Sequence, residues 1–170
     1  MKEKNVFDKR LLKGKNNKRL HALSETVASI GVSEKDAMLV LKDIWEKKPG
    51  IQGLSAVQIG VLKRIILVRY KKQEPFFMVN PEIVWTFGVR DSLEGCESVG
   101  EDRYNVSRSM IGKVTWQDPE DMSTHAAILP YKKLRIIQHE IDHLNGILIS
   151  DKGRYWVGNT VLKKGVFNAK

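Results

Sequence analysis

The sequence is poor in the residues that build disulfide-stabilised and membrane proteins. Among its 170 residues only Cys96 is a cysteine, so no disulfide can form within the chain, and this thiol is free, buried or a metal ligand. No apolar run approaches the length of a membrane-spanning helix, and the first twenty residues lack the apolar core of a signal peptide. We therefore expect one cytoplasmic domain over residues 1–170, long enough to bury a core.

Acidic residues are scarce at the two ends of the chain, whose net charge is +9. Residues 1–20 carry eight Lys or Arg against Glu3 and Asp8, and residues 152–170 carry five against no acid. We predict a basic N-terminal arm over about residues 1–20 and a short basic C-terminal tail over about 152–170. Such charge can attract ribosomal RNA, anionic lipid or acidic protein, or only aid solubility, and no motif for specific DNA binding is present.

Histidine is also rare, and two of the four histidines lie in one motif, His139-Glu140-x-x-His143. Residues i and i+4 lie on one face of a helix, where two imidazoles can bind one transition metal. Glu140 can then face the open position and act as a base toward water. Pro130 suits the start of this helix, and Asn145-Gly146 suits its end.

A catalytic metal site needs a third protein ligand, and the downstream chain does not offer one. From residue 144 to 170 there is no His, Cys or Glu, and Asp151 is the only acid. Ile149 stands where the extended zinc-protease pattern has its third His, which disfavours a zincin-type peptidase. The third ligand should come from upstream, where Cys96 is the only thiol. A purely structural zinc site would normally have four protein ligands and would leave Glu140 without a role.

Apolar periodicity predicts few helices and several short strands. We expect a short helix over residues 20–30 and a longer one that begins after Ser33 and ends before Pro49-Gly50. Strands are predicted over residues 65–68, 76–79, 83–87 and 113–116, with Asn80-Pro81 closing the second. The pattern favours an α+β fold, with antiparallel sheets around the central metal-binding helix.

Three stretches, taken in order, resemble the motifs of the peptide deformylase family. They are Gly53-Leu54-Ser55-Ala56-Val57-Gln58, Glu94-Gly95-Cys96-Glu97-Ser98 and Gln138-His139-Glu140-Ile141-Asp142-His143. The resemblance implies a metallohydrolase that removes the N-formyl group from formyl-methionyl peptides emerging from ribosomes, releasing formate. It also implies one divalent metal ion, Fe²⁺ natively, with Zn²⁺, Ni²⁺ or Co²⁺ as substitutes.

The resemblance also assigns roles to individual residues. The metal ligands would be Cys96, His139 and His143, with Glu140 as general base and then acid, and Gln58 and the backbone N–H of Glu97 as oxyanion donors. Expected substrate-binding residues are Ile51, Gln52, Gly53, Leu93, Arg103 and Ile136, of which Ile51, Leu93 and Ile136 are candidates for an apolar methionine pocket. Glu94 and Arg108 fit a carboxylate–guanidinium pair that braces the Cys96 loop, with an ordinary surface ion pair as the alternative. Asp142 is expected either to brace a histidine or Arg108 or to face solvent.

Two positions depart from the common family pattern. Glu97 stands where common bacterial members have Leu, which adds a negative charge near the metal. Ile51-Gln52 precede Gly53 where Gly-x-Gly is usual, so the loop that pairs with the substrate backbone can differ in shape. These departures keep an alternative open, a deformylase-like peptide-binding protein with weak or no turnover.

Overall fold

A computed structural model of the chain describes residues 11–48, 50–70, 73–157 and 160–161. Its strands form an antiparallel sheet in the order β1-β2-β3-β4-β6-β7, with β5 also paired to β4. The strands are β1 (Gly53–Ser55), β2 (Ile65–Val68), β3 (Phe76–Cys96), β4 (Gly100–Gln117), β5 (Thr124–Pro130), β6 (Arg154–Val157) and β7 (Thr160–Val161). The helices are α1 (Val32–Lys47), α2 (Tyr131–Leu144) and α3 (Ile149–Lys152), and a 3₁₀ turn, η2, covers Ala56–Ile59. The α+β fold predicted from the sequence is confirmed.

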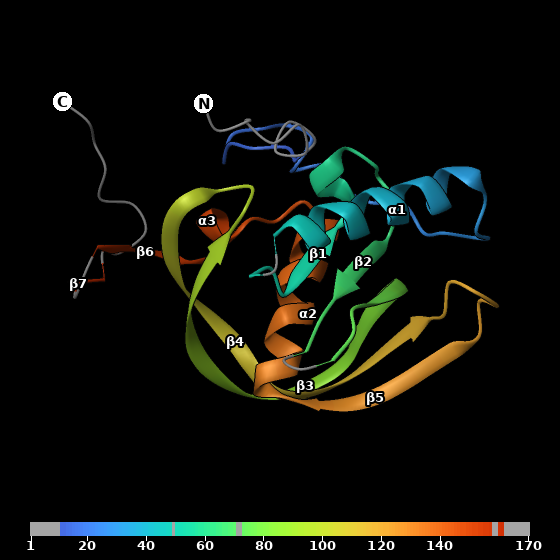
Figure 1. The fold of residues 1–170 in the computed structure, drawn as a ribbon. Coiled ribbons are helices and arrows are strands. Elements are labelled where there is room, and N and C mark those ends of the chain that lie inside the picture. Colours follow the sequence, from blue (N-terminus) through green and yellow to red (C-terminus); the bar gives the residue numbers. More distant parts are fainter. Residues whose placement is uncertain (1–10, 49, 71–72, 158–159, 162–170) are drawn as a thin grey trace.

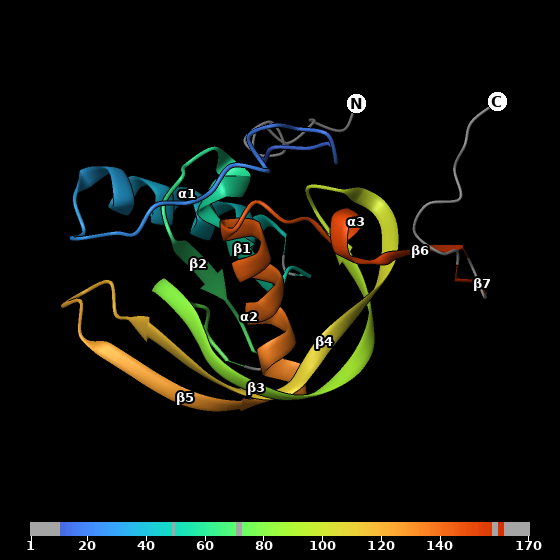
Figure 2. The same ribbon diagram turned by 180° about the vertical axis from the view of Figure 1, so that it is seen from behind.

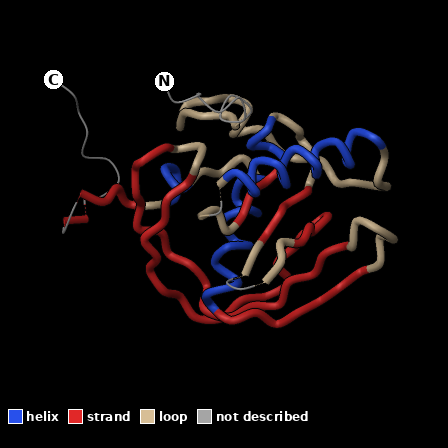
Figure 3. The backbone as a smooth tube through the Cα atoms, viewed as in Figure 1, coloured by secondary structure: helices blue, strands red, loops and turns tan. Residues whose placement is uncertain are grey.

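The long strands β3 and β4 curve around helix α2 (Figures 1 and 2) and dominate the strand content of the fold (Figure 3). The helix packs its apolar face on the sheet, where Leu134, Ile137 and Leu144 are fully buried against Ile66 and Val114. Burial of each such side chain contributes about 1.5–3 kcal/mol. The helix that carries the two histidines is therefore fixed in the hollow of the sheet along its whole length.

Helix α1 covers a second core, in which Met38, Leu41 and Ile44 pack against β1 and β2. It begins at Val32, one residue before the predicted cap Ser33. The carboxylate of Glu34 accepts a hydrogen bond of 3.1 Å from the backbone N–H of Gly31, so an acid in the first turn caps this helix in place of a hydroxyl.

The helix predicted over residues 20–30 is wrong, because this segment is irregular. Its backbone groups find partners far away in the chain. The N–H of Ser24 donates to the carbonyl of Leu144 at 2.9 Å, and the side chain of Asn80 bonds both the N–H and the carbonyl of Val27 at 2.8 Å each. Because tertiary contacts satisfy these groups, a helix is not needed to satisfy them.

The predicted break at Asn80-Pro81 is also wrong, since β3 runs through it as one strand. Asn80 has φ +49°, and the pairing with β4 shifts register between Val79 and Glu82. Asn tolerates the left-handed region, so here it bends a strand that continues. The predicted strands 76–79 and 83–87 are thus parts of β3, and 113–116 is the end of β4.

Residues 21–24, which precede α1, contact the C-terminal end of α2. Gly146 has φ +71°, and an added Cβ there would lie 2.5 Å from the carbonyl oxygen of His21. The His21 ring lies between two carbonyl oxygens, that of Gly146 at 3.0 Å and that of Lys15 at 2.9 Å. Residues 11–20 of the predicted basic arm are thus ordered against the fold, while residues 1–10 and most of the predicted tail lie outside the described residues. None of the described helices is long and apolar enough to cross a membrane.

Tyr70 offers a test of the core that is independent of the site. Burial raises the pKa of Tyr70 to about 12, from an ordinary value of about 10. The unfolded chain therefore ionises first, and the free energy of unfolding should fall by up to about 2.7 kcal/mol as pH rises from 10 to 12. In Tyr70→Phe, which keeps the edge contact with Phe76, this part of the alkaline loss should be absent. Urea unfolding at both pH values measures it, and the same decline in both proteins would contradict it.

Candidate active site

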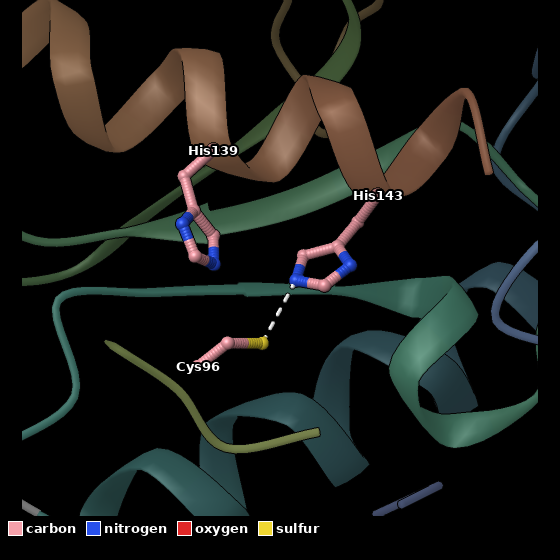
Figure 4. Close-up of side chains that lie close together, drawn as sticks. All are labelled: Cys96, His139 and His143. Carbon is pink, nitrogen blue, oxygen red and sulfur yellow. Dashed lines mark hydrogen bonds between the residues drawn. The ribbon is translucent and has the colours of Figure 1, made fainter. Parts of the chain in front are cut away.

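Cys96, His139 and His143 come together in the hollow between α2 and the end of β3 (Figure 4). The two imidazoles descend from successive turns of α2, and the thiol faces them from the opposite side. Cys96 Sγ lies 3.2 Å from His143 Nε2, and one ligand atom from each residue lies within 4.8 Å of the others. The three predicted metal ligands thus form one cluster, with donor atoms able to reach a single ion.

A charged network behind the cluster fixes its orientation. His139 Nδ1 donates to Glu94 at 3.0 Å, which leaves Nε2 to face the cluster. Arg108 forms two parallel hydrogen bonds to Glu94, of 2.9 Å and 2.8 Å, and its third nitrogen pairs with Asp142. The side chains of Arg108 and Glu94 are both fully buried. Glu94, Arg108 and Asp142 thus form one linked network behind the cluster.

The ionisation of these groups suits a cluster that binds cations. Burial alone would raise the pKa of the Cys96 thiol, but the adjacent His143 and His139 lower it well below its usual value. Burial would likewise raise the pKa of Glu94, yet hydrogen bonds from His139 and Arg108 hold it at about 2. Both groups are therefore negative at neutral pH, and a thiolate is the form of Cys that binds metal.

Glu140 lines a cavity together with Cys96 and His139, from the side of α2 that faces β1. Its Oε2 is buried, and no hydrogen-bond partner for it is found in the described part of the chain. Burial raises the pKa of this carboxyl above its ordinary value. An unsatisfied buried carboxylate is costly, and such groups are typical of sites that handle protons.

The side chain of Gln58 is held in one orientation by Ser55. Gln58 Oε1 accepts a hydrogen bond of 2.9 Å from the Ser55 N–H, and the Ser55 hydroxyl lies 3.2 Å away. The amide nitrogen is thereby directed toward Ser98 Oγ, at 3.1 Å, and Cys96 Sγ, at 3.9 Å. An N–H donor of Gln58 therefore lies next to the cluster of Cys96, His139 and His143, and Ser55 holds it there.

Comparison with known proteins identifies the family of this chain. The family model described as polypeptide deformylase matches residues 9–156, which is most of the chain. The chain belongs to the polypeptide deformylase family. A peptide deformylase of Brachyspira hyodysenteriae is 36% identical over 149 residues, covering 80% of this chain and 76% of the relative.

Solved deformylase structures share the fold. A class I type b peptide deformylase from Acinetobacter baumannii superposes with a TM-score of 0.77 at 27% identity, covering 84% of this chain and 97% of the other. A Plasmodium falciparum peptide deformylase gives a TM-score of 0.75 at 33% identity, covering 84% of this chain and 88% of the other.

The two positions that depart from the common deformylase pattern each make a side-chain contact in the structure. The carboxylate of Glu97 forms an ion pair of 2.8 Å with Lys48, at the end of α1. In the altered loop, Gln52 accepts a hydrogen bond of 3.0 Å from Arg135 of α2. The Glu97–Lys48 ion pair thus joins the loop before β1 to the turn between β3 and β4, and the Arg135–Gln52 hydrogen bond joins the same loop to α2.

The cavity at this deformylase centre has a volume of about 310 Å³. Every predicted substrate-binding residue lines it: Ile51, Gln52, Gly53, Leu93, Arg103 and Ile136. Two residues of the site were not predicted from the sequence. Arg135 also lines the cavity, and Ser98 bonds Gln58. The spacing of Arg135 four residues before His139, on one helix face, was the available signal.

Gly53 is needed where β1 passes Glu140. A Cβ added at Gly53 would lie 2.9 Å from both Cγ and Cδ of Glu140 and would collide with the carboxylate. We expect Gly53→Ala to lower kcat about 10²-fold, because displacement of a reacting group by about 1 Å has an effect of this size. Gly50→Ala is the matched control, since a Cβ there meets nothing within 4 Å. Steady-state deformylation assays compare the two, and equal kcat values would contradict the prediction.

Proposed function

We propose that this protein removes the N-formyl group from the terminal formyl-methionine of newly synthesised polypeptides and releases formate. The observation that carries the proposal is the buried carboxylate of Glu140 beside the Cys96, His139 and His143 cluster, in a chain of the polypeptide deformylase family. Its Oε2 has no hydrogen-bond partner among the described residues. A buried base next to three metal-binding side chains is the arrangement that metal-assisted amide hydrolysis needs.

Cys96, His139 and His143 are proposed to hold one divalent ion. A thiolate with two imidazoles suits Fe²⁺, Zn²⁺, Ni²⁺ and Co²⁺, and Fe²⁺ remains our expectation for the native ion. Cys96 Sγ and His143 Nε2 are 3.2 Å apart, which is close enough for both atoms to bind one ion. When bound, such an ion polarises a carbonyl and makes water more acidic.

The residues of this chain supply the remaining steps. Glu140 takes a proton from the attacking water, whose oxygen bonds to the formyl carbon, and then gives a proton to the amine as the C–N bond breaks. Gln58 Nε2 and the backbone N–H of Glu97 donate to the oxyanion. Because Ser55 holds Gln58 in place beforehand, this donor needs no reorganisation, and one such donor is worth about 2.7–4 kcal/mol.

The alternative of a peptide-binding protein without turnover rested on Glu97 and on the loop at Ile51-Gln52. The Glu97 carboxylate is paired with Lys48, and Gln52 is bonded to Arg135. Neither contact removes Glu140 or Gln58 from the cavity, so neither favours that alternative.

The wider setting of the enzyme is also proposed. We expect one catalytic domain acting in the cytoplasm on nascent chains, with the basic N- and C-terminal segments able to associate with the ribosome. Lys15, in the ordered part of the arm, is 3.5 Å from Asp102, so its charge is partly balanced within the protein.

The function is tested by formate release from formyl-Met-Ala-Ser. The protein is loaded anaerobically with Fe²⁺ and, separately, with Ni²⁺ or Zn²⁺, and the bound metal is measured. We expect formate release that depends on bound metal. Stoichiometric metal without formate release from any form would overturn the proposal and favour a binding role.

A further inference from the structure

Two arginines on the wall of the cavity have no carboxylate partner among the described residues. Arg103 donates only to backbone carbonyl oxygens, of Glu101 at 3.1 Å and Asp102 at 3.3 Å, and Arg135 donates to the neutral amide of Gln52. Within the described residues neither arginine has an ion pair with an acidic side chain.

The acids that line the same cavity are engaged elsewhere. Glu94 is paired with Arg108 and Glu97 with Lys48, while Glu140 stands beside the metal cluster as the base. Among the described residues, the two guanidinium groups are therefore the positive charges of the cavity wall that form no ion pair with an acidic side chain.

Both guanidinium groups are held beside the cluster. Arg135 lies one turn before His139 on the same face of α2, and its bond to Gln52 ties it to the loop before β1. Arg103 lies on Gly95, where an added Cβ would be 2.6 Å from the guanidinium carbon, and Gly95 directly precedes Cys96. The two cations thus flank the centre, one from the helix and one from the strands.

A cavity with two such arginines attracts anions. A guanidinium presents a planar fork of N–H donors that matches a carboxylate, and charge-assisted hydrogen bonds are about twice as strong as neutral ones. A ligand carboxylate that replaces the Gln52 amide as the hydrogen-bond acceptor of Arg135 would therefore be bound more strongly than a neutral ligand group.

We propose that this cavity selects N-formyl substrates that carry a carboxylate close to the formylated end, and that Arg135, together with Arg103, determines this selectivity. The inference rests on the proposed deformylation. The carboxylate can belong to an acidic side chain early in a nascent chain or to the free C-terminus of a very short formyl peptide. The chemistry of recognition is the same, and the substrates below separate the two sources.

The test compares kcat/KM within isosteric pairs at low ionic strength. One pair is formyl-Met-Glu-Ala-amide and formyl-Met-Gln-Ala-amide, and the other is formyl-Met-Ala with a free or an amidated C-terminus. We expect a preference of about fivefold to twentyfold for the charged member of at least one pair. The preference should shrink in about 0.5 M salt, where the Debye length is about 4 Å. Equal kcat/KM values within both pairs would overturn the proposal.

Variants locate the preference in the cavity. Arg135→Met and Arg103→Met should each bring the ratio within the preferred pair toward one. Lys42→Met removes the same charge from an exposed position of α1 that does not line the cavity, and it should keep the wild-type ratio. A ratio that Arg135→Met leaves unchanged would also overturn the proposal. The wild-type comparison does not depend on whether either variant folds.

Binding separates this proposal from the proposed function. The same peptide pairs are titrated into metal-loaded Glu140→Gln protein, which should bind without hydrolysis, and the charged member should bind with the lower Kd. Hydrolysis of the amidated peptides without any charge preference supports deformylation and overturns the selectivity. Charge-selective binding by a protein that hydrolyses no peptide supports the selectivity and overturns deformylation.

Discussion

Replacing Glu140 by Gln is expected to lower kcat/KM for a formyl-Met peptide by about 10²–10⁴ while bound metal is retained. The change keeps the shape of a side chain that is buried beside the cluster, and it removes the group that takes and returns a proton. The ligand set Cys96, His139 and His143 is untouched, so metal affinity should persist. Steady-state kinetics and metal analysis of the same preparations measure both quantities.

The control for this prediction is Glu82→Gln, an exposed position on β3. It makes the same chemical change outside the cavity and should leave both kcat/KM and metal content near the wild-type values. Full activity in Glu140→Gln would show that another group handles the proton. Loss of metal together with activity would show that Glu140 supports the cluster itself.

Arg108→Met should lower the free energy of unfolding by about 3–5 kcal/mol, since it leaves a buried charge without its partner. Arg108 and Glu94 are both fully buried, and Asp142 is also paired with Arg108. The stability supplied by the ionised Glu94 is present above the ordinary carboxyl pKa of 4.5 and is lost as pH falls toward about 2. The defect of Arg108→Met should therefore be largest near neutral pH.

Two further variants make this prediction specific. Arg154→Met breaks an ion pair with Asp91 whose side chains are 47% and 46% exposed, so it should cost only about 0–1 kcal/mol. Glu94→Gln combined with Arg108→Met removes both charges and should recover part of the loss. Urea unfolding in one defined metal state compares all the variants, because bound metal adds to apparent stability. A loss below 1 kcal/mol in Arg108→Met would contradict the prediction.

The sequence was most informative where function depends on local spacing. The i, i+4 separation of His139 and His143 places them on one helix face in any tertiary setting. The resemblance to deformylases brought in Cys96, and the structure places its thiol beside His143. The fold class followed in the same way from apolar periodicity and turn residues.

Longer-range features were less predictable. Asn80-Pro81 has the composition of a turn, but the Asn80 side chain is bonded to Val27, a residue 53 positions away, and β3 continues. The same contacts between Asn80 and Val27 hold residues 20–30 in an irregular conformation in place of the predicted helix. The only local sign of Arg135 was its position four residues before His139, since its hydrogen-bond partner is Gln52, 83 positions earlier.

The contacts at the end of α2 impose an order on how the protein is made. His21 and Ser24 are synthesised well before their partners Gly146 and Leu144, which lie 125 and 120 positions later in the chain. Loop closure over such a separation is slow and cannot occur before the later residues are available. His21 and Ser24 therefore cannot form these contacts, and the cluster of Cys96, His139 and His143 cannot assemble, until the end of α2 has emerged.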